Sequence, residues 1–243
     1  FAKVNSSKCE PVVMDEQFNS AVTDIFRNEY LSPRSPYTTL QIPKQGIGEW
    51  CHPLHTVDID DSGLRSSVQK GVLNTKLGVP FRTPAEGQNI AFTSLWDNYP
   101  DSLTVSLKGK ASRAYLLMAG STNHMQCHID NGLIRVYYKD GTCDKMALRN
   151  PDNWAPIEHI FFEDGLAFNR HAPALYRLRL KTGEISNNFG EELGFPGASR
   201  ELDGGAAILL EMPLNPDKKL SHLVLETLSN DVVIGLMGIT LQR

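Results

Sequence analysis

Residues 133–148 read LIRVYYKDGTCDKMAL, and this stretch decides the fold prediction. Two runs rich in β-branched and aromatic residues flank Asp140-Gly141, a dipeptide that accepts the positive φ angles of a two-residue type I′ hairpin turn. The stretch therefore predicts a β-hairpin. Polar segments precede and follow it, AGSTNHMQCHIDNG and NPDNWAPIE, and we expect them to be loops that display side chains from the end of a β-framework.

Size and charge narrow the functional classes. The chain has 243 residues, of which 41% are hydrophobic and 21% are charged, which is typical of a soluble globular protein. A net charge of −4 gives no general attraction to nucleic acid or anionic lipid, so neither partner is predicted. No apolar run approaches the roughly 20 residues that a membrane-spanning helix needs. Because the sequence starts at Phe1 without an initiator methionine, we expect a processed chain or a piece of a larger protein.

Residues 1–44 are predicted to form a separate region. A short helix is expected within residues 15–31, where apolar residues recur at helical spacing and Asp15 is available as an N-cap: Phe18, Val22, Ile25 and Phe26. Three prolines between residues 32 and 43 then force an extended strap. We expect this region to pack on the main domain or to lead in from a preceding one.

Residues 45–243 are predicted to form one β-domain. Tyr176, Leu178 and Leu180 alternate with basic residues, Arg177 among them, which is typical of a strand with one wet face. Further strands are predicted at residues 103–107, 114–118, 207–214, 223–227 and 232–241, the last of them buried on both sides. Many short strands without alternating helices indicate an all-β sandwich and not a parallel α/β sheet.

Two segments carry partial metal-binding patterns. DIDDSG at residues 58–63 matches the opening of a calcium loop, with Asp58, Asp60 and Ser62 as oxygen donors, but its twelfth position lacks the glutamate. A polar turn is the alternative. His124 and His128 have the spacing of a helical zinc pair, yet the alternation of their segment favours a strand. Calcium is thus the one cofactor candidate, and otherwise no cofactor is predicted.

Catalytic patterns are sparse. A glycosidase needs two carboxyl groups across a cleft, and Glu158, Glu163 and Asp164 are the only acids near the loop-rich region. The sequence has no G-x-S-x-G elbow, no P-loop and no complete dinucleotide fingerprint. A glycoside hydrolase that pairs Glu158 with Glu163 or Asp164 stays an alternative, but the residues favour a chain that is not an enzyme by itself.

Two tryptophan segments, LWDNYP at 95–100 and NPDNWAP at 150–156, predict carbohydrate binding. Sugar recognition combines an aromatic face with amides and acids that bond to hydroxyl groups. The candidate residues are Trp96, Asp97, Asn98, Tyr99, Asn153 and Trp154. The alternative is that both tryptophans are core residues and that the neighbouring Asx residues only shape turns.

The run IDNGLIRVYYKDGTCDKMAL followed by NPDNW resembles the strand, Tyr-x-Asp-Gly-Thr, strand, Asn-x-x-Asn-Trp pattern of galactose-binding-like β-sandwich modules. From about residue 40 to 243, with LQIPKQGIGEW, NIAFTSLWDNYP, YLLMAGSTN and NDVVIGLMGITL, the chain looks like an uncharacterised secreted family of Bacteroidetes-type bacteria, associated with glycoside hydrolases. The resemblance implies a jelly-roll sandwich, export to the periplasm or cell surface, and a role in polysaccharide breakdown. It implies no catalytic residues.

Residues and resemblance together predict a non-catalytic accessory module. Its partner is expected to be a glycan, a catalytic domain of the same polypeptide, or both. The alternatives are the hydrolase described above and a purely structural β-sandwich whose aromatic residues are all buried.

Overall fold

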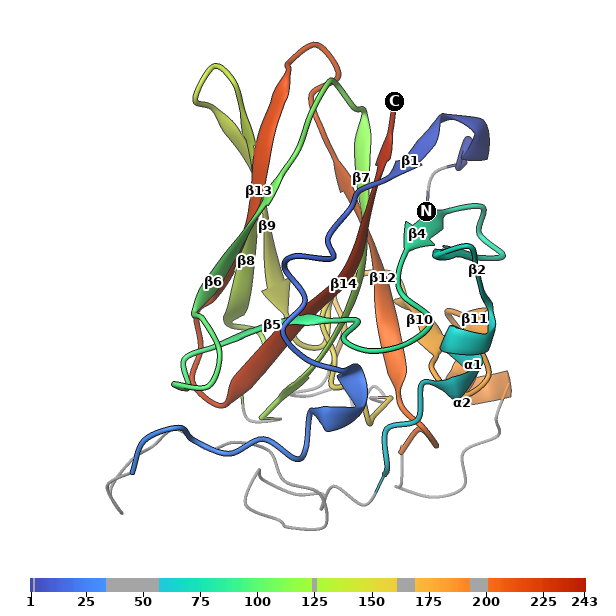
Figure 1. Ribbon diagram of the computed structural model, residues 1–243, viewed down its shortest axis with the longest axis vertical. Helices are drawn as coiled ribbons and strands as arrows, with labels where there is room; N and C mark the ends of the chain where they lie inside the picture. The colour runs from blue at the N-terminus through green and yellow to red at the C-terminus, as the bar shows by residue number, and fades with distance from the viewer. Residues whose placement is uncertain (2, 34–56, 124–125, 161–168, 193–200) are drawn as a thin grey trace.

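Two antiparallel β-sheets face each other in the computed structural model, which describes residues 1, 3–33, 57–123, 126–160, 169–192 and 201–243 (Figure 1). The larger sheet has seven strands, and six of them follow the order β1-β14-β7-β12-β10-β11, with β5 also pairing with β14. The smaller sheet has the order β6-β13-β8-β9. The predicted all-β sandwich is confirmed.

The strands have the following bounds. The larger sheet consists of β1 (Cys9–Pro11), β5 (Ala91–Ser94), β7 (Arg113–Thr122), β10 (Tyr176–Arg179), β11 (Ile185–Ser186), β12 (Ala206–Pro213) and β14 (Val232–Gln242). The smaller sheet consists of β6 (Ser102–Ser106), β8 (Asp130–Tyr138), β9 (Cys143–Arg149) and β13 (Leu220–Thr227). A third, three-stranded sheet contains β2 (Val68–Gln69), β3 (Val72–Asn74) and β4 (Pro80–Arg82).

Helical structure is short. The described residues contain the 3-10 helices η1 (Ser6–Lys8) and η2 (Val22–Asp24) and the α-helices α1 (Ser62–Ser66) and α2 (Phe189–Glu192). None of the described helices has the length and apolar character needed to cross a membrane.

The larger sheet is buried on both faces. In β7, Leu116 and Met118 point into the core between the two sheets, whereas Tyr115 and Leu117 point into a second core on the opposite face. We call these the inner core and the outer core. The outer core is closed by β3, β4, α1 and the N-terminal segment. Because β14 also contributes to both cores, its sequence is a nearly continuous apolar run, and its predicted burial on both sides is confirmed.

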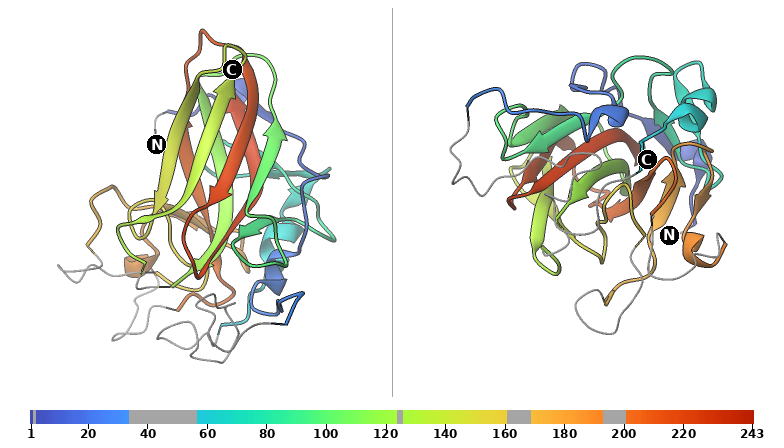
Figure 2. Two further views of the ribbon diagram at one scale, coloured as in Figure 1. Left: turned by 90° about the vertical axis from the view of Figure 1, so that its left-hand side faces the viewer. Right: turned by 90° about the horizontal axis from the view of Figure 1, so that it is seen from below.

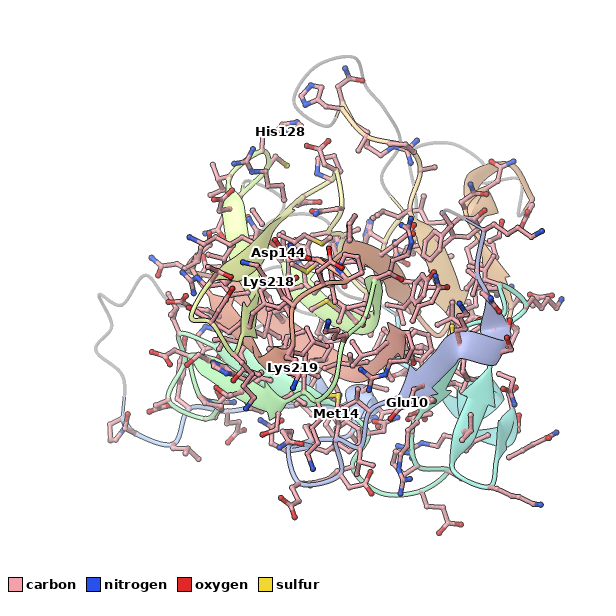
Figure 3. The ribbon with its side chains drawn as sticks, turned by 90° about the horizontal axis from the view of Figure 1, so that it is seen from above. Glu10, Met14, His128, Asp144, Lys218 and Lys219 are labelled. Carbon is pink, nitrogen blue, oxygen red and sulfur yellow. The ribbon has the colours of Figure 1, made fainter. Side chains whose placement is uncertain are left out.

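The hairpin between β8 and β9 is confirmed, but its turn differs from the prediction. Only Gly141 has a positive φ, at 84°, whereas a type I′ turn requires it at Asp140 as well. The Tyr138 N–H donates to the Thr142 carbonyl at 2.9 Å, so the loop has three residues and ends in a glycine. The Asp140 carboxylate accepts hydrogen bonds from Thr142 and pairs with Lys218 (labelled in Figure 3), and these contacts lower the pKa of Asp140 to about 2.

The predicted N-terminal helix does not form. Residues 15–31 contain turns, an isolated β-bridge and η2. Phe18 packs in the inner core, whereas the apolar residues that follow it pack in the outer core, and one helical stripe cannot face both. The Asn19 side chain instead bonds to both the N–H and the carbonyl of Phe92 at 2.9 Å, which ties the segment to β5. Residues 34–43 of the proposed strap and the predicted domain boundary at 45 lie outside the described residues.

Candidate functional site

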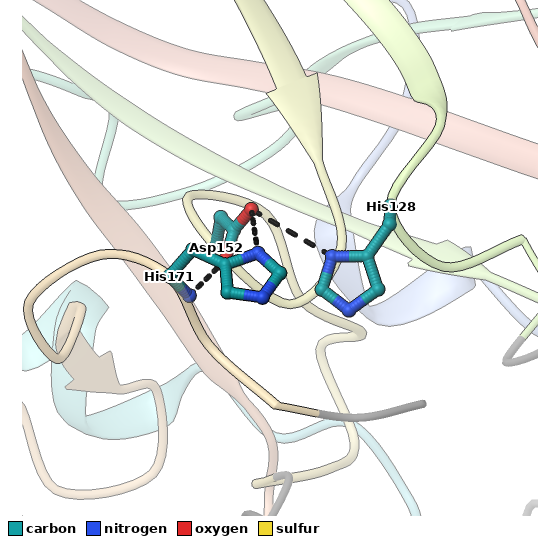
Figure 4. A group of neighbouring side chains, drawn as sticks. All are labelled: His128, Asp152 and His171. Atoms are coloured by element: carbon teal, nitrogen blue, oxygen red, sulfur yellow. Dashed lines mark hydrogen bonds and ion pairs between the residues drawn. The ribbon is translucent and has the colours of Figure 1, made fainter. Parts of the chain in front are cut away.

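Three side chains from distant parts of the sequence meet at the end of the sandwich opposite the hairpin turn. His128 lies just before β8, Asp152 just after β9, and His171 in the loop before β10. One metal-ligand atom of each residue lies within 4.8 Å of the other two, and the three side chains point toward one another (Figure 4). Because β8 begins where its antiparallel partner β9 ends, the pairing of these strands brings the first two residues together.

Backbone contacts position the three residues. His128 has φ 54°, a left-handed conformation that is uncommon outside glycine, and its N–H donates to the Asn150 carbonyl at 2.8 Å. The Asp152 Oδ1 atom accepts a hydrogen bond of 2.7 Å from the His171 N–H. The buried Asn131 side chain donates to the Gln126 and Ile129 carbonyls and so holds the loop around His128. The site is therefore built on loops that are bonded to the sandwich.

The side chains converge without bonding directly to one another. Asp152 Oδ2 lies 3.8 Å from His128 Nδ1 and 3.9 Å from His171 Nδ1, and the two imidazole ring centroids are 4.8 Å apart. His171 is exposed, whereas the other two side chains are half-buried. Two imidazoles and a carboxylate can bind a cation or exchange protons.

A second polar group near this end is buried and has a structural role. Arg177 lies inside the molecule, so its predicted place on a wet face is wrong. Its guanidinium donates to the carbonyls of Pro156, His159 and Ala206 at 2.9, 2.7 and 3.0 Å, and thereby ties the loop after β9 to the larger sheet. Burial lowers the pKa of Arg177 to about 10, against the opposing effect of the neighbouring Glu158 carboxylate.

The proposed hydrolase pair is only partly described. Glu158 is 1% exposed, and its carboxylate accepts a long hydrogen bond of 3.4 Å from the Ser121 hydroxyl. It also lies close enough to Arg177 to oppose the fall in its pKa. Glu163 and Asp164 lie outside the described residues. The surroundings of Glu158 are those of a buried charge partner, not of a group open to a substrate.

Both tryptophans of the predicted sugar-binding segments are core residues. Trp154 is 0% exposed and packs in the inner core, and Trp96 is 2% exposed and packs in the outer core. Neither ring has an exposed face on which a sugar could stack, so the expected stacking role does not agree with their position. Tyr99 packs beside Phe92 in the outer core, and burial raises the pKa of Tyr99 to about 12.

The polar residues of these segments shape turns. The Asp97 carboxylate accepts hydrogen bonds of 2.9 Å from the N–H groups of Leu31 and Ser32. The Asn153 side chain accepts from the Arg149 N–H and donates to the Ala147 carbonyl, each at 2.8 Å. Asn98 is half-buried. These contacts are those expected of Asx residues in turns.

The proposed calcium segment anchors α1. Asp60 Oδ1 accepts a hydrogen bond from the Ser62 N–H at 2.9 Å, and Asp61 bonds to Arg65 and to Asn89 at 2.8 Å. Asp58 is exposed at the start of the segment. These contacts are those of a polar turn, the alternative to a calcium loop for this segment.

The outer face of the smaller sheet, which is toward the viewer in the left view of Figure 2, carries an aromatic pair and an ion pair. Tyr137 of β8 lies directly opposite His222 of β13, and their rings stack with centroids 4.8 Å apart and an interplanar angle of 15°. Next to them, the Arg135 guanidinium bonds to the Glu226 carboxylate at 2.6 Å, and this bond raises the pKa of Arg135. Within the described residues no strand or helix packs over this face.

Sequence reasoning did not find either feature. The sequence pattern pairs His128 only with His124, which lies outside the described residues, and gives no sign of Asp152 and His171 because they belong to other loops. The alternation in residues 133–138 was the one available signal for the sheet face, since it places Arg135 and Tyr137 on the same side.

Searches with this chain found no matching family model, curated protein or solved structure.

Proposed function

We propose that this chain is a non-catalytic accessory module of a secreted polysaccharide-degrading protein, and that it binds carbohydrate on the outer face of its smaller sheet. The observation that carries the proposal is the stacked pair of Tyr137 and His222 on a sheet face that no described element covers. Aromatic rings pack against the apolar C–H face of a pyranose, and this contact needs rings that are accessible from solvent.

The register explains why the ring pair is accessible. Across the sheet, His222 pairs with Ser106 of β6, and Tyr137 pairs with Cys143 of β9. The flanking side chains, Ser106 and Cys143, are short, so the two rings project further from the sheet than the side chains on either side of them. Tyr137 and His222 are half-buried, in contrast to the fully buried Trp154. The accessible rings of this sheet face therefore support a carbohydrate-binding platform here better than the buried rings of the tryptophan segments do.

Hydrogen-bonding groups lie in the next rows of the same face. Arg135 lies two residues before Tyr137 on the same side of β8, and its partner Glu226 lies on β13. Their side chains are 25% and 35% exposed, so both charged ends are accessible to sugar hydroxyl groups. Lys145 of β9 pairs with Arg135 in the register and adds a second donor, which is exposed. Charged groups beside an aromatic platform are the combination that orients a sugar.

The test is a glycan array with the full chain, followed by calorimetric titration of the best glycan. Tyr137→Ala is expected to weaken binding at least about tenfold, which corresponds to about 1.4 kcal/mol. Tyr137→Phe keeps the ring and is expected to lose much less. The matched control is Trp96→Phe, because Trp96 is buried and its replacement should leave glycan affinity unchanged.

Two results would contradict the proposal. One is the absence of binding to every glycan on the array by a folded chain. The other is a glycan whose affinity is the same for the Tyr137→Ala chain and the unmodified chain. If the chain instead binds a catalytic domain of the same polypeptide and no glycan, its accessory role is docking.

A further inference from the structure

We propose that His128, Asp152 and His171 form a binding site for one divalent transition-metal ion of the zinc class. This site lies at the loop end of the sandwich and is separate from the sheet face that carries the proposed carbohydrate binding. The starting observation is the convergence of three ligand-bearing side chains from three loops, as Figure 4 shows.

The distances within the trio are too long for direct hydrogen bonds, but they are compatible with ligands that share one ion. Asp152 Oδ2 is 3.8 Å from His128 Nδ1 and 3.9 Å from His171 Nδ1, whereas N–H···O hydrogen bonds extend to about 3.2 Å. Ligands placed tetrahedrally about 2.1 Å from zinc are about 3.4 Å from one another. Each of these two contacts therefore needs to shorten by about 0.5 Å around an ion, and the two imidazole nitrogens, which lie within 4.8 Å of each other, must also move closer together.

His128 has unused bonding capacity at both ring nitrogens. Its Nε2 atom is buried and has no hydrogen-bond partner among the described residues, and its Nδ1 atom is too far from Asp152 for a hydrogen bond. A buried polar atom without a partner is unfavourable, so such atoms need an explanation. An ion bound by Nδ1, Asp152 and His171 uses the Nδ1 lone pair and leaves the proton on Nε2, so the ion does not by itself satisfy the buried Nε2 atom.

The donor set selects the class of ion. Two imidazole nitrogens and one carboxylate oxygen suit zinc and its transition-metal neighbours, whereas calcium and magnesium prefer oxygen ligands throughout. Three protein ligands leave a fourth tetrahedral position for water or another ligand. The single carboxylate neutralises half of the charge of a divalent ion.

The site is partly organised before an ion arrives. The hydrogen bond from the His171 N–H orients the Asp152 carboxylate, and the Asn150 carbonyl fixes the backbone of His128. The His171 side chain is 66% exposed, so an ion can enter from solvent and draw this imidazole inward. Bonds that hold a ligand in place in this way reduce the ordering that binding requires.

The experiment is a zinc titration of the full chain, free of affinity tags and stripped of metal, followed by calorimetry. One zinc ion per chain is expected, with no binding of calcium or magnesium in the same range. Asp152→Asn removes the charge but keeps an acceptor for the His171 N–H, and it is expected to weaken zinc binding about 100-fold or more. The control is Asp130→Asn, since Asp130 lies at the same end but pairs with Arg149.

A double variant tests the imidazoles. His128→Asn combined with His171→Asn should abolish the site, and asparagine is suited to the left-handed backbone at residue 128. Circular dichroism and the unfolding midpoint establish that each variant folds, and X-ray absorption at the zinc edge should show two imidazole ligands in the unmodified chain. Three results would overturn the assignment: no zinc binding by the folded chain, zinc affinity unchanged in either variant, or calcium bound as tightly as zinc.

Discussion

Replacement of Arg177 by methionine is expected to destabilise the protein severely. The substitution keeps an unbranched side chain of similar length but removes the guanidinium, which donates to three carbonyls from two segments of the chain. These carbonyls lose a charged donor, and Glu158 loses the nearby positive charge in a buried setting. Arg177 thus connects the loop after β9 to β12 through its guanidinium.

The size of the effect follows from the burial of both charged groups. A hydrogen bond to a charged group contributes about 1.5–3 kcal/mol, and removing one partner of a buried charge pair costs about 3–5 kcal/mol. The two estimates describe overlapping losses, so we expect about 3–5 kcal/mol in total. At about 2–4 °C per kcal/mol for a domain of this size, the midpoint of thermal unfolding should fall by roughly 6–20 °C.

Arg179→Met is the matched control, because Arg179 lies two residues further along β10. The Arg179 side chain is also largely buried, at 15% exposed, but its guanidinium makes only a long contact of 3.4 Å with a Glu184 carboxylate that is 57% exposed. We therefore expect a smaller loss of stability than for Arg177→Met. Urea unfolding followed by tryptophan fluorescence compares the two variants, since Trp96 and Trp154 are buried in the folded chain. Equal midpoints for the two variants, with equal denaturant dependence, would refute the reasoning and show that desolvation of Arg177 cancels its hydrogen bonds.

Two further predictions concern the replacement of two glycines and the pH dependence of the hairpin turn. Gly120→Ala should cost about 3 kcal/mol, because an added Cβ would overlap the Val233 carbonyl and lie 2.7 Å from the Trp154 ring. Gly141→Ala should cost only about 1–2 kcal/mol, from its left-handed backbone in open space, and equal losses in urea unfolding would contradict this comparison. Because the folded-state pKa of Asp140 is lowered to about 2, its ionised form stabilises the hairpin turn above about pH 4, and this contribution is lost as the pH falls through about 2. The amide resonance of Thr142 should report that transition, and a midpoint near pH 4 would contradict it.

The strands were predictable because their signal is local. Alternation between apolar and polar residues marks β6 and β8, which have one face in the inner core and one toward solvent. The long apolar run of β14 marks a strand that contributes to both cores. In each case the side-chain period of two residues is visible within a few positions of the sequence. The hairpin was predicted for the same reason.

Features that depend on tertiary contacts were not predictable in the same way. Phe18 and the apolar residues after it have helical spacing in the sequence. They nevertheless pack in two different cores, so they do not form one face of a helix. Arg177 has the alternation of a solvent-facing residue and is nevertheless buried, because three carbonyls from other segments surround its guanidinium. Trp154 sits in a polar, turn-rich segment, yet its ring fills the inner core. Sequence composition around a residue does not specify which side of the backbone a core occupies.

The candidate metal site shows the same limit more strongly. His128, Asp152 and His171 share no motif, and the intervals between them match no known ligand spacing. Antiparallel pairing of β8 and β9 brings the first two loops together, and a hydrogen bond from the His171 N–H attaches the third. Only the near end of this pairing, the hairpin, was evident from the sequence. The approach of His128 and Asp152 at the opposite end of the two strands follows only from the strand register, which the sequence does not reveal.

The two proposed sites should act independently of each other. From Asp130 at the start of β8 to Tyr137 the strand advances seven residues, or about 23 Å at about 3.3 Å per residue. Coupling over such a distance requires an element with two arrangements, and β8 is paired on both edges along its length. Saturating zinc should therefore change glycan affinity by less than about threefold, and by linkage the glycan should change zinc affinity equally little. A change of tenfold or more, about 1.4 kcal/mol of coupling, would show instead that one ligand contacts both sites or that the sandwich has a second conformation.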